Sequence, residues 1–244
     1  MKKIILAAIA TVFFAGNAFA ERYVMVTHGE GKDPFWPVVE KAGADAAAQM
    51  GADFEYIFNP SGDLADMASS IQAAAATQPD GMVVSLPDPD SLGNAIRAAT
   101  ASGIPVITIN SGLEAYKEVG ALMHIGQPET LAGQKAGERA AAEGATKALC
   151  MTPEQYNTAL SDRCNGYGEN VEIVSSVDTT HDAATIVTRA TAALQANPDV
   201  NAILSVSPTS CIGTAKALDD LGMSVHHSCS VSYTHLRAHE TYDH

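Results

Sequence analysis

Short apolar runs alternate with longer helix-forming segments along this chain, and the alternation limits the folds that it can adopt. We predict strands over 22–28, 53–58, 81–86, 104–110, 121–126, 147–151, 171–177 and 201–206. We predict helices over 35–51, 63–78, 91–103, 129–144, 162–169, 182–197 and 209–222. Short buried strands that alternate with helices favour an α/β fold of doubly wound parallel sheets covered on both faces. Ligands in such sheets bind beyond the carboxyl ends of the strands, so functional residues are expected there.

The first twenty residues, 1–20, have the pattern of a secretory signal peptide. Two lysines precede an apolar run over 4–14, and the small-x-small sequence of residues 18–20 marks a cleavage site. The apolar run is too short to span a bilayer comfortably, which disfavours the alternative of a membrane anchor. We therefore expect a mature chain that begins at Glu21 and is exported to the periplasm.

The formal net charge of −14 gives the chain an acidic surface. Such a surface repels nucleic acids and anionic membranes, so neither is an expected partner. The sequence contains no GxSxG, P-loop or HExxH motif, and no nucleophile is identifiable beside His28 and Asp33. We therefore expect a binding protein rather than an enzyme, and no cofactor.

Two adjacent aromatic residues follow the first predicted strand. Phe35 and Trp36 begin a helix there, and Asp33 comes just before them. An aromatic face packs against the C–H face of a sugar ring, while a carboxylate accepts hydrogen bonds from hydroxyls. Trp36 is the only tryptophan and stands at an expected ligand-facing position, so we favour this reading over the alternative that both rings are core residues.

Other predicted strands also end in polar residues. Asn110 and Ser111 follow the fourth strand, and Ser207 follows the strand over 201–206. Arg163 stands early in the helix after residues 147–151, where its rigid fork of donors suits adjacent hydroxyls. The alternative for Arg163 is a salt bridge. After the third strand, the two aspartates of "PDPDS" are expected to cap the next helix.

Export to the periplasm permits disulfides, and the chain has four cysteines. Cys150 and Cys164 flank one loop, and a bridge between them would close a ring of about 15 residues and contribute about 3 kcal/mol. The alternative is two buried free thiols. Cys211 has no obvious partner in the sequence.

Residues 21 to about 223 resemble the ribose-type periplasmic sugar-binding proteins that serve ABC importers. The motifs that carry the resemblance are "DPFWPVVEKAG", "PDGMVVSLPDPDSLGNAIRAATASGIPVITIN", "HIGQPETLAGQKAGE", "SDRCNGY" and "LQANPDVNAILSV". The resemblance implies two Rossmann-like lobes, 21–126 and 127–223, which are joined by a hinge and hold the ligand between them. It also implies a monomer that delivers its ligand to an inner-membrane ABC permease. An alternative is a sensor that presents its ligand to a chemoreceptor or sensor kinase.

The family's contact positions fall on residues that are partly altered here. The resemblance implies that Asp33, Phe35, Trp36 and Arg163 contact the ligand, and it adds His181 after "SSVDTT". Two sites depart from the family pattern, because an acid and an arginine are replaced by Asn110 and Ser111, and an Asn-Asp pair by Ser207 and Pro208. These departures imply a sugar or polyol ligand and speak against ribose itself.

The regular pattern ends after Met223, and five of the eight histidines follow it. His235 and His239 are four residues apart and, with Cys229, suggest a zinc protein or zinc-dependent enzyme as an alternative function. However, Val231 to Thr241 resembles the translation of a transposase-type sequencing adapter. We therefore expect residues 224–244 to be a doubtful or non-native tail on a chain truncated at its C-terminus, and we expect no metal site.

Overall fold

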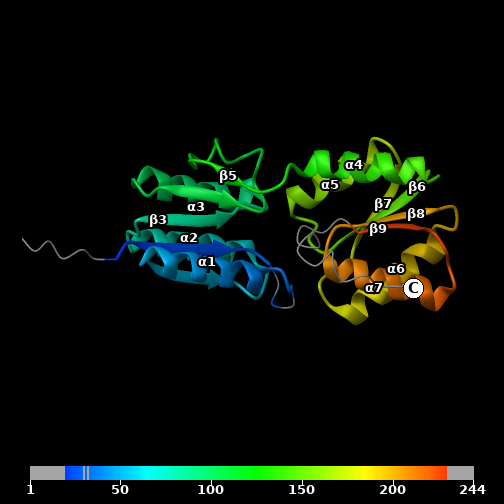
Figure 1. Ribbon diagram of the computed structural model, residues 1–244, viewed down its shortest axis with the longest axis horizontal. Helices are drawn as coiled ribbons and strands as arrows, with labels where there is room; N and C mark the ends of the chain where they lie inside the picture. The colour runs from blue at the N-terminus through cyan, green and yellow to red at the C-terminus, as the bar shows by residue number, and fades with distance from the viewer. Residues whose placement is uncertain (1–19, 30, 32, 230–244) are drawn as a thin grey trace, which may run out of the picture.

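The computed structural model describes residues 20–29, 31 and 33–229, which form two α/β lobes placed side by side along the long axis of the molecule (Figure 1). The strands are β1 (Arg22–Thr27), β2 (Asp53–Phe58), β3 (Gly81–Ser85), β4 (Val106–Ile109), β5 (His124–Ile125), β6 (Lys147–Thr152), β7 (Glu172–Asp178), β8 (Ala202–Ser205) and β9 (His226–Cys229). The helices are α1 (Trp36–Met50), α2 (Leu64–Ala76), α3 (Pro89–Ala101), α4 (Glu129–Ala142), α5 (Thr158–Gly168), α6 (Ala183–Ala196) and α7 (Pro208–Leu221). The predicted signal peptide and the adapter-like segment lie outside the described residues, apart from Ala20.

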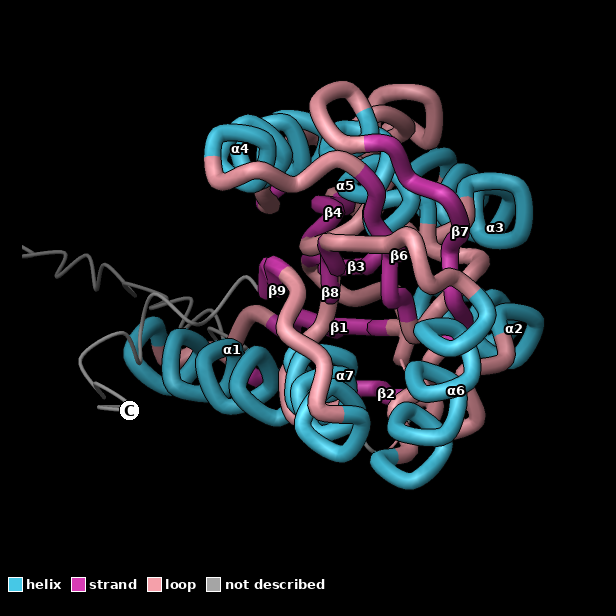
Figure 2. The backbone as a smooth tube through the Cα atoms, turned by 90° about the vertical axis from the view of Figure 1, so that its right-hand side faces the viewer, coloured by secondary structure: helices cyan, strands magenta, loops and turns pink. Residues whose placement is uncertain are grey.

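The first lobe is built on a parallel sheet with the strand order β2-β1-β3-β4-β5. The central strands are apolar on both faces, because helices cover both: Figure 2 shows α2 and α3 on one side and α1 on the other. Val24, Val26 and Val84 are fully buried in the core beneath α2 and α3. The predicted α/β class with parallel sheets in two lobes is confirmed.

The second lobe contains a parallel sheet with the order β7-β6-β8-β9, covered by α4 and α5 on one face and by α6 and α7 on the other (Figure 2). Its last strand lies beyond Met223, where we expected a doubtful tail. β9 pairs in register with β8, from Ala202↔His226 to Ser205↔Cys229. β9 is a half-exposed edge strand made of polar residues, so it lacks the apolar run that marks the other strands. The second sheet therefore extends to Cys229.

Capping residues set where most helices begin. Asp88 accepts a hydrogen bond from the backbone N–H of Asp90 at the start of α3, as we predicted for this turn. Asn157 accepts from the backbone N–H of Ala159 and starts α5 four residues before the predicted boundary at 162. This early start places the first turn of α5 against the first lobe.

Two disulfides fasten the second lobe. Cys150 of β6 is bonded to Cys164 of α5, which confirms the predicted bridge. Cys211 of α7 is bonded to Cys229 of β9, a pairing that the sequence did not reveal because β9 was not recognised as a strand. Among the described residues, no helix has the length and apolar character needed to cross a membrane.

Candidate functional site

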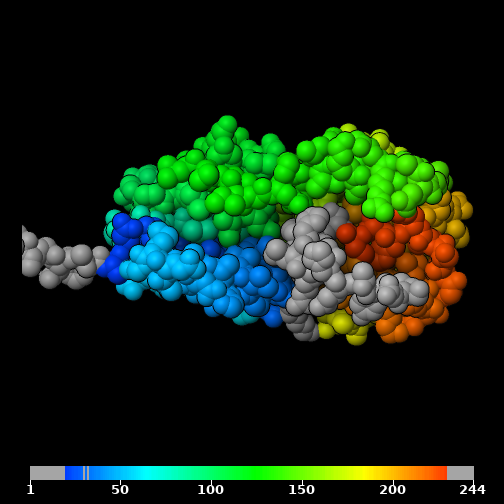
Figure 3. Space-filling model, viewed as in Figure 1, coloured from blue at the N-terminus to red at the C-terminus, as the bar shows by residue number. Residues whose placement is uncertain are grey.

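A cavity of about 60 Å³ lies where the two lobes meet, beyond the carboxyl ends of β1, β4, β6 and β8. In the space-filling view the lobes meet midway along the molecule (Figure 3). Both lobes line the cavity. The first lobe contributes His28, Asp33, Phe35, Trp36 and Asn110. The second lobe contributes Pro153, Glu154, Asn157, Leu160, Arg163, His181, Val206, Ser207 and Pro208. Seven of the eight predicted contact residues are thus gathered at one cavity.

The start of α1 supplies the aromatic wall of the cavity. Trp36 is buried and meets the rings of His28 and Phe35 edge-on, with centroid distances of 4.9 Å in both pairs. Phe35 is half-buried, so more of its ring is accessible than of Trp36. Trp36 is therefore buried, as the core alternative predicts, and it also lines the cavity.

Asp33 supplies a carboxylate on the same side. Its Oδ1 accepts a hydrogen bond from the backbone N–H of Phe35 at 2.9 Å, which fixes the turn before α1. Burial raises the pKa of the Asp33 carboxyl, and the nearby Glu154 carboxylate adds to this, although the Phe35 hydrogen bond and the imidazoles of His181 and His28 oppose it. A ligand hydroxyl could donate to this carboxylate.

Asn110 and Ser111 take different positions at the end of β4. Asn110 lines the cavity, and its φ of 62° is a left-handed conformation that asparagine tolerates better than most residues. Ser111 is buried behind it and does not line the cavity. The Ser111 hydroxyl lies 2.8 Å from Oδ1 of Asn110 and 3.2 Å from Oδ1 of Asn157. Ser111 therefore orients two amide side chains rather than facing the cavity.

Arg163 lines the cavity and also forms a buried ion pair. Its Nε donates to Glu129 at 2.6 Å, and its Nη1 donates to the carbonyl of Val206 at 3.0 Å. Close packing of α4 on α5 makes this possible, because a Cβ added at Gly133 would overlap the backbone carbonyl of Arg163. The salt bridge that we weighed as an alternative is therefore present, but it is buried and stands at the cavity.

His181 and Ser207 complete the wall from the second lobe. Nδ1 of His181 lies 3.2 Å from the hydroxyl of Thr209, and its Nε2 lies 3.6 Å from Oε1 of Glu154. Ser207 is the N-cap of α7, where its hydroxyl accepts from the backbone N–H of Ser210. Thr180, just before His181, has a φ of 55°, an outlier for a β-branched residue. Strain of this kind is often kept at functional sites.

Three polar residues of the cavity were not among the predicted contacts, namely His28, Glu154 and Asn157. Glu154 and Asn157 lie in "TPEQYN", directly after β6, so the rule on strand ends could have found them. Burial favours a higher pKa for the Glu154 carboxyl, but the charge of His28, the proximity of His181 and the Asn157 amide outweigh it and lower the pKa. Nδ2 of Asn157 donates to Oε2 of Glu154 at 2.8 Å. Glu154 is therefore a buried, ionised carboxylate at the cavity.

Direct hydrogen bonds also join the lobes around the cavity. The backbone N–H and the hydroxyl of Thr158 both donate to the carbonyl of Pro87, at 2.9 and 3.1 Å. Nδ2 of Asn157 lies 3.1 Å from Nε2 of His28, whose Nδ1 lies 2.7 Å from the hydroxyl of Ser85. The two lobes are thus held in a closed arrangement.

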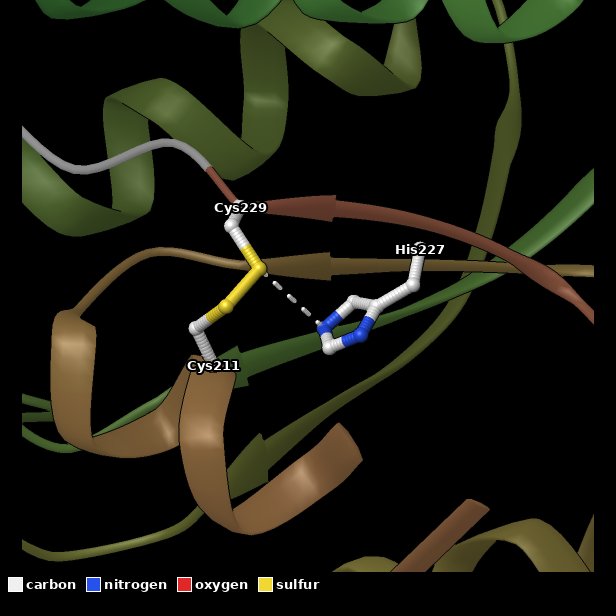
Figure 4. Close-up of side chains that lie close together, drawn as sticks. All are labelled: Cys211, His227 and Cys229. Atoms are coloured by element: carbon white, nitrogen blue, oxygen red, sulfur yellow. Dashed lines mark hydrogen bonds between the residues drawn. A yellow bond between two sulfur atoms is a disulfide. The ribbon is translucent and has the colours of Figure 1, made fainter. Parts of the chain in front are cut away.

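One group of metal-ligand residue types occurs among the described residues, away from the cavity. Cys211, His227 and Cys229 lie within 4.8 Å of one another, and Figure 4 shows the two sulfurs joined as a disulfide beside the imidazole. Zinc binds cysteine as the thiolate, and the sulfurs of a disulfide are not thiolates. Of the three residues in this group, His227 alone therefore offers a usual zinc ligand. His235 and His239, on which the zinc alternative depended, lie outside the described residues.

Comparisons with known proteins agree with this architecture. The sequence profile of the family described as "Periplasmic binding protein domain" matches residues 23–229. The chain is 23% identical to the ribose import binding protein RbsB of Escherichia coli K12, over 86% of this chain and 72% of that protein. The crystal structure of a carbohydrate transporter from Acidothermus cellulolyticus 11B, in complex with myo-inositol, is similar with a TM-score of 0.80 and 33% identity, over 86% and 73% of the two chains.

A glucose-galactose binding protein from Geobacillus stearothermophilus, GanP, shares the fold with a TM-score of 0.77 and 23% identity, over 86% of this chain and 78% of that one. The family profile spans both lobes and the cavity between them, including β9. The chain therefore belongs to the periplasmic binding protein family, in its ribose-type class of sugar-binding proteins.

Proposed function

We propose that this protein captures a sugar or polyol in the cavity between its lobes and delivers it, as a monomer, to an ABC import permease in the inner membrane. The observation that carries the proposal is the convergence of seven predicted contact residues from both lobes on one cavity. Membership of the sugar-binding class and the similarity to a myo-inositol complex support the same role. The ligand leaves the cavity chemically unchanged.

The residue types at the cavity suit a polyhydroxylated ring. Phe35 and Trp36 offer an apolar wall, while Asp33, Glu154 and Asn110 offer oxygen acceptors for hydroxyl groups. Because the two lobes contribute opposite walls, a ligand that contacts both favours the closed arrangement over an open one. The permease could then distinguish loaded from unloaded protein by the surface that closure presents.

Calorimetric titration of the purified chain with pentoses, hexoses and cyclitols tests the proposal. We expect at least one of them to bind with a Kd in the micromolar range or below. Binding of none of them at millimolar concentration would remove sugars and polyols as the ligand class.

A Phe35→Ala variant tests whether the aromatic wall contacts the ligand. We expect about tenfold weaker binding or more, because a partly accessible ring is lost from the cavity. Val38→Ala in the same helix is the matched control, since Val38 is 54% exposed and does not line the cavity. Equal affinities for the two variants would contradict the assignment of the site.

A further inference from the structure

One oxygen of the Glu154 carboxylate, Oε1, makes no direct hydrogen bond to a described residue and faces the imidazole of His181. The side chain is 5% exposed, and Oε1 lies 3.6 Å from Nε2 of His181. The other oxygen, Oε2, accepts from Nδ2 of Asn157 at 2.8 Å and lies 3.4 Å from Nε2 of His28. A buried carboxylate oxygen without a hydrogen bond is costly, so a donor is expected at this position when the site is in use.

The described lining of the cavity contains two carboxylates and one guanidinium. Asp33 and Glu154 contribute one carboxylate from each lobe. The guanidinium of Arg163 donates to the Glu129 carboxylate through Nε and to the Val206 carbonyl through Nη1. Among the described residues, the imidazoles of His28 and His181 also lie near these two carboxylates.

The charged groups at the cavity affect which hydroxylated ligands it can bind. A ligand carboxylate or phosphate would meet the buried Glu154 carboxylate, the half-buried Asp33 carboxylate and an arginine that is already paired with Glu129. Like charges brought together in a dry site repel strongly, because the local dielectric screens them poorly. A neutral polyol instead brings O–H donors, which both carboxylates can accept through charge-assisted hydrogen bonds.

We propose that Glu154 is a specificity-determining contact that restricts the cavity to neutral polyols and excludes sugar acids and sugar phosphates. The inference rests on the proposed function and deepens it. Its Oε1 accepts a hydrogen bond from a ligand hydroxyl, and its charge, together with that of Asp33, rejects anions. Asn157 and His28 position the carboxylate from the side away from that oxygen.

The test compares matched neutral and acidic ligands on Glu154→Gln, which keeps the shape of the side chain and removes its charge. Calorimetry would use glucose, galactose and myo-inositol against glucuronate, galacturonate and glucose 6-phosphate. For the tightest neutral ligand we expect at least tenfold weaker binding by the variant, equivalent to about 1.4 kcal/mol. We also expect the ratio between the Kd of the corresponding acid and the Kd of that neutral ligand to fall by a similar factor in the variant.

Two further variants keep the test decisive. Glu154→Asp retains the charge, so it should still reject the acids although its reach is shorter. Glu172→Gln, an exposed site on β7, makes the same charge change away from the cavity and should leave all affinities unchanged. Thermal melts of each variant identify any that fails to fold. If Glu154→Gln fails to fold, the test depends on Glu154→Asp alone. Binding of the acids by Glu154→Asp would then overturn the inference.

Each outcome separates this inference from the proposed function. Equal binding of a neutral polyol by wild type and Glu154→Gln would overturn the role of Glu154 while sugar binding stands. Tighter binding of an acid than of its neutral counterpart by the wild type would overturn the charge selection in the same way. Binding of none of the ligands would overturn both.

Discussion

Arg163 stands at the cavity and in a buried ion pair, so its removal should affect both stability and binding. The pair joins Nε of Arg163 to Oε2 of Glu129 at 2.6 Å, with both side chains less than 10% exposed. Two unit charges about 4 Å apart attract by about 4 kcal/mol at an effective dielectric of 20. Breaking a buried pair by removing one partner costs about 3–5 kcal/mol, because the remaining charge is left uncompensated.

We therefore expect Arg163→Met to lower the free energy of unfolding by about 4 kcal/mol. Urea titration followed by far-ultraviolet circular dichroism measures this, since it reports on the helices of both lobes. Arg97→Met is the control, because Arg97 is exposed on α3 and should change stability by less than about 0.5 kcal/mol. A loss below 1 kcal/mol for Arg163→Met would refute the reasoning.

The double variant Arg163→Met/Glu129→Leu separates the two roles. With both charges removed, no uncompensated charge remains in the interior, and much of the lost stability should return. Ligand affinity should not return, because the cavity still lacks the guanidinium. Recovery of affinity together with stability would assign Arg163 to the ion pair alone.

Three other features give separate predictions. Burial, assisted by the neighbouring His226, lowers the pKa of His227 to about 4. The unfolded chain takes up this proton near pH 6.5, so stability should fall as the pH drops from 6.5 to 4, by at most about 3 kcal/mol. His227→Asn should show a smaller loss between pH 7 and pH 4.5 in urea titrations, and an identical loss would contradict this.

Replacement of Cys211 and Cys229 by serine opens a loop with a sequence separation of 18 residues, and thermal unfolding should show a loss of about 3 kcal/mol. An unchanged melting temperature would argue against the bridge. Thr180→Gly should raise the unfolding free energy by about 1 kcal/mol, because glycine adopts a φ of 55° without strain. A lower unfolding free energy for Thr180→Gly in the same urea titration would contradict this. It would show that the contacts of the threonine side chain stabilise the protein by more than the backbone strain costs.

The sequence was most informative where apolar spacing and strand ends coincide. β1 and β4 are marked by apolar runs, and the residues after them, Asp33 and Asn110, reach the cavity because parallel strands bring their carboxyl ends to one edge. Arg163 was predicted for the same reason. Such residues can be found without coordinates because the rule depends only on the order of strands.

What the sequence could not reveal depends on contacts between distant segments. His28 and Asn157 are 129 residues apart, and their pairing depends on how the lobes face each other. β9 escaped notice because a polar edge strand carries no hydrophobic period, and Cys211 then had no visible partner. The lack of a direct hydrogen bond to Oε1 of Glu154 is likewise a property of packing rather than of residue order.

The bonds from Thr158 to Pro87 and from Asn157 to His28 join protein to protein, so they contribute to closure whether or not a ligand is bound. The apparent Kd of a protein that binds in its closed form equals the intrinsic Kd divided by the fraction already closed. Residues that do not line the cavity, such as Thr158 and Pro87, can therefore tune the ligand affinity over orders of magnitude. The same bonds reduce the difference in the closed fraction between ligand-bound and ligand-free protein. A protein that closes without ligand presents the same closed surface to the permease as a loaded one.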